Sequence, residues 1–172
     1  MNSFYLLGSS HHTAVDGCIL AKGYLRHPSI SKSFAPIRVS PVYETPAVGF
    51  DGPNFHNLVI GFKTGQSPGE VYQRLRDIES SRNRVRTGEQ FDSRTLDLDL
   101  LLYGEQCIVN ESFRIPHDDV LRYAFVLKPL VDLSPGLKHP VLGIALRELW
   151  CSFKPDKARE LVDVSAQYQV CS

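Results

Sequence analysis

The feature that most constrains the fold is the segment from Ser93 to Tyr103, which reads Ser-Arg-Thr-Leu-Asp-Leu-Asp-Leu-Leu-Leu-Tyr. Apolar and polar residues alternate in it with a period of two, which predicts a β-strand. One face of this strand carries Leu96, Leu98, Leu100 and Leu102, and the other carries Thr95, Asp97, Asp99, Leu101 and Tyr103. The leucine face needs a core to cover it, so we expect a sheet packed against other elements.

The opposite face carries two carboxylates, Asp97 and Asp99. They lie about 7 Å apart along a strand that rises ~3.4 Å per residue. Aspartate is a poor strand former, and like charges on one face repel. One interpretation is a solvated acidic face. The other is a magnesium site, because two carboxylates at this spacing can hold two metal ions that also contact phosphate oxygens.

Length and composition predict a single domain over residues 1–172, with residues 151–172 as a C-terminal tail that the sequence does not define further. The 19 basic and 19 acidic residues cancel, which gives no support for nucleic-acid binding. No apolar run approaches the ~20 residues of a membrane span, and the N-terminus lacks the pattern of a signal peptide. The four cysteines are scattered, so we expect a cytoplasmic protein with reduced thiols that bind no metal.

Strands and helices alternate before the acidic strand. We expect strands at residues 4–7, ended by the glycine and serines at 8–10, at residues 33–43 as an edge strand with two prolines, and at residues 55–62. Residues 44–54 are expected to form a loop, and residues 13–26 a helix. A second helix begins with the capping box Ser67-Pro68-Gly69-Glu70 and is expected to end near Ser81. Its buried stripe is Val71, Leu75 and Ile78.

After the acidic strand, residues 104–106 predict a turn that pairs residues 107–109 with it as a hairpin. Residues 115–119 are expected to form a turn, residues 120–133 a helix bent at Pro129, residues 144–150 a short helix and residues 161–164 a strand. This order favours an α+β fold, a ferredoxin-like α/β sandwich with a mainly antiparallel sheet and helices packed on it. We expect the helices on one sheet face, and Asp97 and Asp99 on the other face or in a cleft formed with the loops.

Several further residues have two interpretations each. The arginines before the acidic strand either form a solvated helix end or fold over a polyphosphate; they are Arg82, Arg84, Arg86 and Arg94. Glu79 and His117 read as surface residues or as contacts to a nucleotide. Asn57, beside Phe55, reads as a polar strand residue or as a group that binds the edge of a flat heterocycle. Phe125 reads as a core residue by default.

Together these residues resemble the 6-hydroxymethyl-7,8-dihydropterin pyrophosphokinase family. Residues 94–100, Arg-Thr-Leu-Asp-Leu-Asp-Leu, match the most specific signature of the family, and Pro116-His117 begins its second. Further matches are Leu7-Gly8-Ser9, Tyr43-x-Thr45-Pro46, Phe55-x-Asn57, Ile78-Glu79, Arg84-Val85-Arg86 and Phe125-Val126-Leu127-x-Pro129-Leu130. Their order and spacing hold over residues 4–135.

The resemblance implies transfer of pyrophosphate from ATP to the hydroxymethyl group of a dihydropterin in folate biosynthesis, with two Mg²⁺ ions and only small molecules as partners. It implies that Asp97 and Asp99 bind the metals, that Arg84 and Arg94 contact the phosphates, and that Glu79 and His117 contact the nucleotide. The implied pterin contacts are Phe55 and Phe125 on its faces and Asn57, Thr45, Pro46 and Val48 on its edge. The loops at residues 45–54 and 84–93 would close over the substrates.

Four positions depart from the family pattern: Ser10, Thr87, Asp118 and Tyr123 stand where asparagine, a basic residue, an apolar residue and arginine are usual. The metal and pterin residues therefore match better than the cationic lining. Two alternatives stay open: a paralogue that acts on a modified pterin, and a non-catalytic module that binds a nucleotide or pterin.

Overall fold

The computed structural model describes residues 2–11, 38–46, 54–82, 97–153 and 161–168. The helix predicted over residues 13–26 lies outside these ranges, and so do the greater parts of both loops expected to close over the substrates. Within the described residues no helix is long and apolar enough to span a membrane. The prediction of a single domain over the whole chain stays a prediction.

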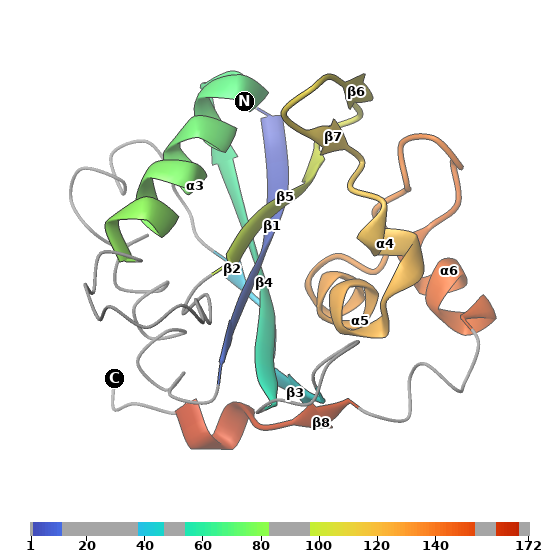
Figure 1. The fold of residues 1–172 in the computed structure, drawn as a ribbon. Coiled ribbons are helices and arrows are strands. Elements are labelled where there is room, and N and C mark those ends of the chain that lie inside the picture. Colours follow the sequence, from blue (N-terminus) through green and yellow to red (C-terminus); the bar gives the residue numbers. More distant parts are fainter. Residues whose placement is uncertain (1, 12–37, 47–53, 83–96, 154–160, 169–172) are drawn as a thin grey trace.

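An antiparallel sheet with strands of different lengths forms the centre of the fold (Figure 1). Its strands run in the order β5 (Asp97–Tyr103), β1 (Asn2–His11), β4 (Phe55–Thr64), β3 (Tyr43–Thr45) and β8 (Val162–Asp163), and β2 (Arg38–Val39) also pairs with β4. This confirms the α+β class. The end predicted for the first strand at residues 8–10 is wrong, because Gly8 pairs with both Leu58 and Leu98 inside the sheet.

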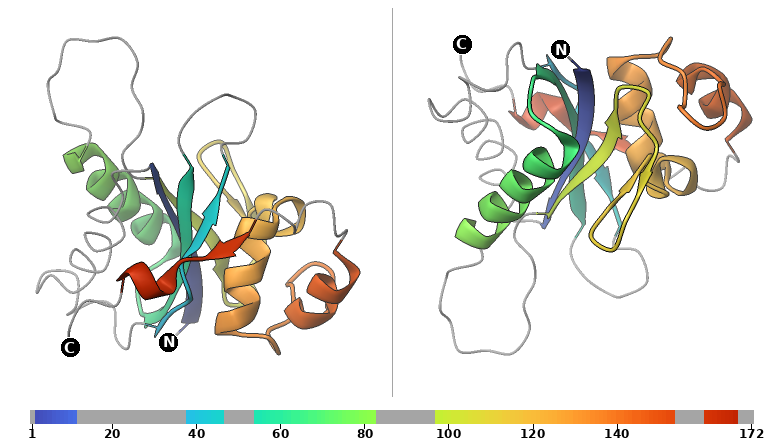
Figure 2. Two further views of the ribbon diagram at one scale, coloured as in Figure 1. Left: turned by 90° about the horizontal axis from the view of Figure 1, so that it is seen from below. Right: turned by 90° about the horizontal axis from the view of Figure 1, so that it is seen from above.

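Helices cover both faces of the sheet (Figure 2). One core cluster joins α3 (Pro68–Arg82) to one face and contains Val71, Leu75, Ile60 and Leu98. The other joins α5 (Ala124–Leu133) to the opposite face around Val59. The expectation that the helices share one face is therefore wrong for these two helices. The reason lies in β4, whose residues 56–62 are all buried and so need cover on both sides.

The capping box of α3 is present as predicted. The backbone N and the Oγ of Ser67 both donate to Oε2 of Glu70, at 2.7 and 2.8 Å, and the N of Glu70 donates back to Ser67 Oγ at 3.3 Å. The predicted inward residues of this helix are buried, and it ends one residue after the predicted position. Local sequence therefore determines where α3 starts, and its apolar stripe determines how it packs.

A β-bulge interrupts the alternation of β5. Tyr5 of β1 pairs with Leu102 and Leu6 pairs with Leu100, so Leu101 is an extra residue in this strand. Leu101 and Leu102 consequently both join the α5 core, whereas Tyr103 joins the α3 core. The faces predicted by strict alternation are therefore correct for Leu98 and Leu100 and wrong for Leu102 and Tyr103.

The region after β5 also differs from expectation. The turn at Gly104 is present, with the N of Gln106 donating to the O of Tyr103 at 3.1 Å, but β6 (Ile108–Val109) pairs with β7 (Arg114–Ile115) and not with β5. The helix predicted over 120–133 is two helices, α4 (Asp119–Arg122) and α5, because the extended backbone of Tyr123 separates them. Pro129 lies inside α5. The helix α6 (Leu146–Ser152) and the short 3₁₀ helix η2 (Ser165–Tyr168) complete the described chain.

Candidate functional site

The register of the sheet brings two predicted site residues into one row. Ser9 of β1 pairs with Asn57 of β4 on one side and with Asp97 of β5 on the other. Directly paired residues point to the same face and adjacent strands lie about 4.8 Å apart, so the backbones of Asn57 and Asp97 are about 10 Å apart. The next row on that face contains Val59 and Asp99. Both aspartates therefore lie on the sheet face that α5 covers further along β5. They do not lie on a face free of helices.

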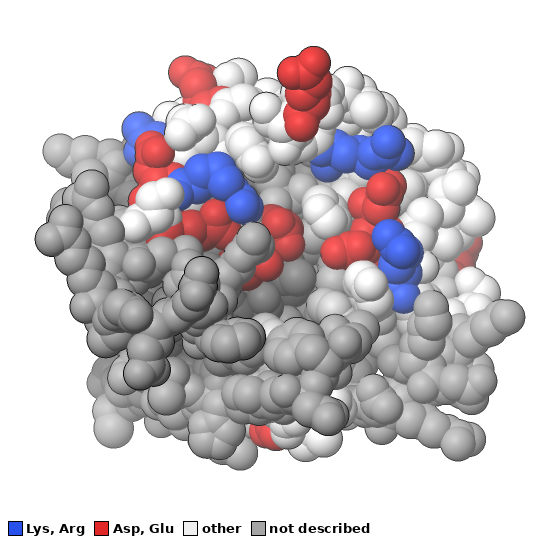
Figure 3. Space-filling model, viewed as in Figure 1, with Lys and Arg blue, Asp and Glu red and all other residues white. Residues whose placement is uncertain are grey.

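Acidic side chains gather over β5, the strand that carries Asp97 and Asp99, between α3 and α4 (Figure 3). Both aspartates are partly buried. Burial raises the pKa of Asp99 above its usual value, and the charge of Asp97 raises it further, against smaller opposing effects of His117 and Arg76. The pair is thus held together at an electrostatic cost that a bound cation would relieve.

Glu79 of α3 is buried, with 8% of its surface exposed, so its interpretation as an exposed helical glutamate is wrong. Its Oε1 accepts a 2.7 Å hydrogen bond from the backbone N of Leu98, at the outer edge of β5. Burial raises the pKa of Glu79 to about 7; the bond from Leu98 and the charge of Arg76 oppose this rise, and Asp97 adds to it. Glu79 therefore fixes the strand beside Asp97 and Asp99 and belongs to the same charged group.

Sequence reasoning did not identify Arg76, one turn before Glu79. Its Nη1 forms a 2.8 Å ion pair with Glu79 Oε2, its Nη2 donates to the O of Leu98, and Nη2 lies 3.7 Å from Asp99 Oδ1. The spacing of three residues between Arg76 and Glu79 on a helix was the available signal. No group of three or more potential metal-ligating side chains converges within the described part of the chain, so the aspartates carry the metal-site prediction.

The pterin-edge residues predicted on β3 and β4 are in contact. Nδ2 of Asn57 donates to Oγ1 of Thr45 at 2.9 Å, and both side chains are buried. Phe55 pairs directly with Thr45 and is half-buried, whereas Pro46 is exposed after the end of β3. A polar pair beside a partly accessible ring is suited to the edge and face of a flat heterocycle.

Phe125, in the first turn of α5, packs partly exposed against the core on the same sheet face. The ring of Tyr123 stacks on it, with centroids 4.9 Å apart and an interplanar angle of 17°. The guanidinium of Arg122 lies 5.9 Å from the centre of the Tyr123 ring. Where the family resemblance predicts an arginine, this chain thus adds a second aromatic ring beside Phe125.

His117 follows a cis peptide bond between Ile115 and Pro116. Its backbone N donates to the O of Leu101 at 2.9 Å, and its Nδ1 lies 3.6 Å from Asp119 Oδ2. This bond holds His117 beside the bulge of β5, the strand that also carries Asp97 and Asp99. Three other predicted site residues, Val48, Arg84 and Arg94, lie outside the described residues, as does Thr87.

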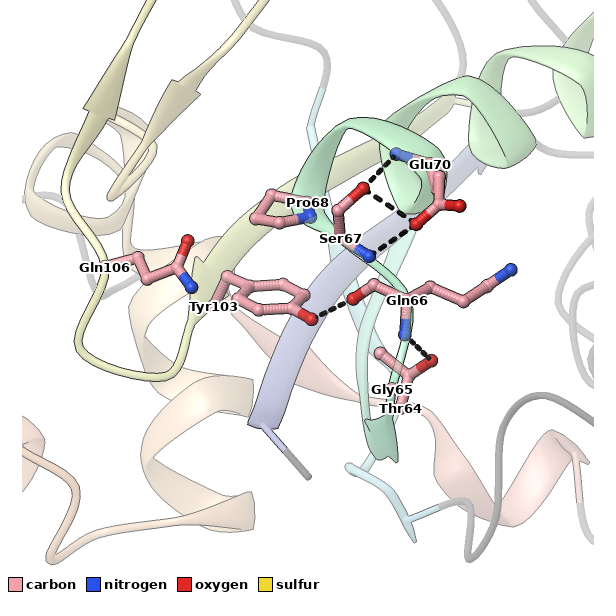
Figure 4. A pocket seen from close by; sticks show the side chains of 8 residues that line it. All are labelled: Thr64, Gly65, Gln66, Ser67, Pro68, Glu70, Tyr103 and Gln106. Atoms are coloured by element: carbon pink, nitrogen blue, oxygen red, sulfur yellow. Dashed lines mark hydrogen bonds between the residues drawn. The ribbon is translucent and has the colours of Figure 1, made fainter.

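An open pocket of about 440 Å³ lies at the other end of β5, against the start of α3 (Figure 4). Tyr103 lines it and donates its hydroxyl hydrogen to the O of Gln66. Ser67 and Glu70 also line it, and their polar atoms bond to each other in the capping box. The predicted site residues are not among its lining residues, so it is not part of the candidate site.

Comparisons with known proteins identify relatives of the chain. The chain is 38% identical over 116 residues to a folic acid synthesis protein of Pneumocystis carinii, which covers 67% of this chain and 16% of that protein. It is 40% identical over 105 residues to the 2-amino-4-hydroxy-6-hydroxymethyldihydropteridine pyrophosphokinase of Pseudomonas aeruginosa, covering 60% and 64%. The chain thus spans less than two thirds of the length of these two relatives. The pyrophosphokinase of Haemophilus influenzae is 33% identical over 141 residues, covering 81% and 86%.

Solved structures show the same fold. A crystal structure of a fused HPPK-DHPS protein in complex with substrates matches with a TM-score of 0.70 at 13% identity, over 90% of this chain and 44% of that one. The Plasmodium falciparum HPPK-DHPS structure matches with a TM-score of 0.71 at 15% identity, over 98% and 46%. The family model for 7,8-dihydro-6-hydroxymethylpterin-pyrophosphokinase matches residues 6–135, well over half of the chain. The chain therefore belongs to the 7,8-dihydro-6-hydroxymethylpterin-pyrophosphokinase family.

Proposed function

We propose that this chain transfers pyrophosphate from ATP to the hydroxymethyl group of 6-hydroxymethyl-7,8-dihydropterin, giving AMP, as a step of folate biosynthesis. The observation that carries the proposal is the row that joins Asn57 to Asp97 across β1, with both residues on one sheet face. A spacing of about 10 Å suits a substrate whose flat ring binds at Asn57 and whose reacting hydroxymethyl group points toward the aspartates.

ATP requires a divalent cation for this chemistry, and Asp97 and Asp99 fit such an ion because they are neighbouring oxygen donors whose repulsion His117 and Arg76 offset only in part. We propose that they hold two Mg²⁺ ions. Bound there, the metal would neutralise charge on the phosphate oxygens. The protein's own contribution is the positioning of the two reactants, since phosphoryl transfer depends mainly on alignment and charge neutralisation.

The remaining roles are the ones that the family resemblance implies. Thr45, Asn57, Pro46 and Val48 are proposed to bind the pterin edge, and Phe55 and Phe125 its two faces. Glu79, His117, Arg84 and Arg94 are proposed to bind the nucleotide, with the two arginines on the phosphates. We also propose a cytoplasmic location, which the exposed free thiols of Cys107 and Cys151 support.

The direct test is incubation of purified protein with ATP, Mg²⁺ and 6-hydroxymethyl-7,8-dihydropterin, followed by detection of AMP. Asp97→Asn and Asp99→Asn are each expected to lower the turnover number by at least ~10²-fold, the scale of losing one preorganised electrostatic contact. Asp77→Asn makes the same chemical change at an exposed position of α3 and serves as the control. Absence of AMP with wild-type protein would refute the activity, and near-normal turnover of both site variants would refute the metal assignment.

A second candidate is a paralogue that acts on a modified pterin. The ring of Tyr123 stacked on Phe125 favours it, because it enlarges the aromatic surface where the family pattern predicts a cation. The same assay with pterins that differ at the 6-substituent distinguishes the two, since a paralogue would release AMP faster with a derivative. A non-catalytic binding module would release no AMP with any of them.

A further inference from the structure

Three acidic side chains, Glu79, Asp97 and Asp99, form what we call the carboxylate cluster. Glu79 comes from α3 and the two aspartates from β5. Among the described residues, Arg76 forms the ion pairs with this cluster. Its guanidinium nitrogens lie 2.8 Å from Glu79 and 3.7 Å from Asp99. His117 and Asp119 also act on Asp99 through their charges, in opposite directions. Among the described residues, the cluster thus carries up to three negative charges against the one permanent positive charge of Arg76.

The two ion pairs of Arg76 differ in kind. The contact with Glu79 is at hydrogen-bonding distance, and Nη2 also donates to the backbone O of Leu98, so these two partners fix the guanidinium. The 3.7 Å separation from Asp99 exceeds a normal hydrogen bond, so Arg76 attracts that carboxylate through charge alone. Nε of Arg76 is buried and has no hydrogen-bond partner among the described residues. Asp99 can therefore leave Arg76 without breaking a hydrogen bond.

We propose that Arg76 is a built-in counter-ion of the carboxylate cluster that competes with a divalent cation for Asp99 and thereby weakens metal binding by the nucleotide-free protein. This inference rests on the proposed function only in taking Asp97 and Asp99 as metal ligands. Arg76 is a positioning residue, because it acts on the proposed metal ligand Asp99. A cation brought in with its nucleotide carries further ligands and competes more successfully than a free ion.

Substitution of Arg76 separates its charge from its shape. Arg76→Gln removes the positive charge and keeps an N–H donor, so the cluster loses the cation that forms ion pairs with Glu79 and Asp99. We expect the affinity for a free divalent cation to rise at least ~10-fold, because a charge a few Å from the metal site acts through a partly buried medium. Arg76→Lys keeps the charge and should therefore change the affinity less than Arg76→Gln does.

The matched control is Arg74→Gln, which removes the same charge from the same helix. Arg74 acts on Glu70 at the start of α3 and is one of the partly exposed arginines of this helix. If net charge alone governed metal binding, Arg74→Gln would tighten it as much as Arg76→Gln. We expect the control to change the affinity by less than about threefold, because solvent screens a distant exposed charge.

The experiment is titration of nucleotide-free wild-type protein and each variant with Mn²⁺, followed by calorimetry or electron paramagnetic resonance of the free ion. Arg76→Met is a second neutral replacement, and circular dichroism identifies which neutral variant is folded. At least ~10-fold tighter Mn²⁺ binding by a folded neutral variant, lost again on adding Asp99→Asn, supports the proposal.

Unchanged or weaker binding in the neutral variants would overturn it, and so would equal tightening in Arg74→Gln. The AMP assay keeps this result distinct from the proposed function. If the wild-type protein releases AMP but Arg76→Gln binds Mn²⁺ no more tightly than the wild type does, only the role of Arg76 is refuted. Wild-type protein that releases no AMP refutes the proposed activity, whatever Mn²⁺ binding shows for Arg76.

Discussion

Removal of one hydroxyl group, in Tyr43→Phe, tests how α5 is held to β3. The Tyr43 hydroxyl donates to Asp132 Oδ2 at 2.6 Å and accepts from Nζ of Lys128 at 3.0 Å, so it joins a strand residue to two charged residues of the helix. Tyr43 itself is 6% exposed. Because Tyr43 pairs directly with Asn57, this network lies immediately beside the candidate pterin-edge residues.

The magnitude follows from what the substitution leaves behind. Hydrogen bonds to charged groups contribute about 1.5–3 kcal/mol each, and an unsatisfied buried partner would add to the loss. Lys128 and Asp132 remain bonded to each other, which limits that penalty. We therefore expect a decrease of about 3 kcal/mol in the free energy of unfolding, the lower limit for two such bonds, or roughly 6–12 °C in Tm for a chain of this length.

The assay is urea unfolding at pH 7, with Tyr72→Phe as the control because the Tyr72 ring is held by stacking on Phe113 at 4.8 Å. A double-mutant cycle with Asp132→Asn should give a coupling energy of at least ~1 kcal/mol. A loss below about 0.5 kcal/mol in Tyr43→Phe, or additive effects in the cycle, would refute the reasoning. The hydroxyl would then be no better bonded in the fold than in water.

Three further predictions concern packing, pH and rate. Leu101→Ala should lower the free energy of unfolding by about 2–5 kcal/mol, because the bulge buries Leu101 fully; a loss below 1 kcal/mol in urea would contradict that burial. Burial lowers the pKa of His139 below the usual value of 6.5, so the folded state resists protonation more than the unfolded state does. The stability that neutral His139 contributes is present above pH 6.5 and is lost as the pH falls through the folded-state pKa. Wild type should therefore lose more stability than His139→Gln between pH 7 and 5, and equal losses would contradict this prediction. Tyr123→Arg should raise the rate of the chemical step in single-turnover experiments more than it changes ATP affinity; a silent Tyr123→Arg together with an impaired Arg122→Ala would show that Arg122 already fills this role.

Sequence was a reliable guide where structure depends on neighbouring residues. The capping box at Ser67 and Glu70 was predicted because its hydrogen bonds join residues three apart. The apolar stripe of α3 follows from the period of a helix. The two-residue period of a strand places Asn57 on one face of β4 with apolar neighbours. Asp97 and Asp99, the proposed metal ligands, were identified because both lie within one short strand.

Sequence was a poor guide where distant segments decide the outcome. The bulge at Leu101 depends on the register between β1 and β5, which alternation within one strand does not contain. Glu79 was read as exposed because nothing in its helix indicates that the edge of β5 covers it. The break at Tyr123 separates α4 from α5 although both sides have helix-forming sequences. The role proposed for Arg76 likewise depends on a strand more than twenty positions away.

The residues that surround Asp97 and Asp99 also bond to the outer edge of β5, which is an outermost strand of the described sheet. The N and O of Leu98 bond to Glu79 and Arg76, and the O of Leu101 bonds to the N of His117. An outer strand with free N–H and C=O groups is a template for pairing with another molecule and leads to aggregation. We therefore expect the bonds from Glu79, Arg76 and His117 to keep this edge from pairing with another molecule as well. Substitutions at Glu79 or Arg76 carry a solubility risk that a lost activity alone would not reveal.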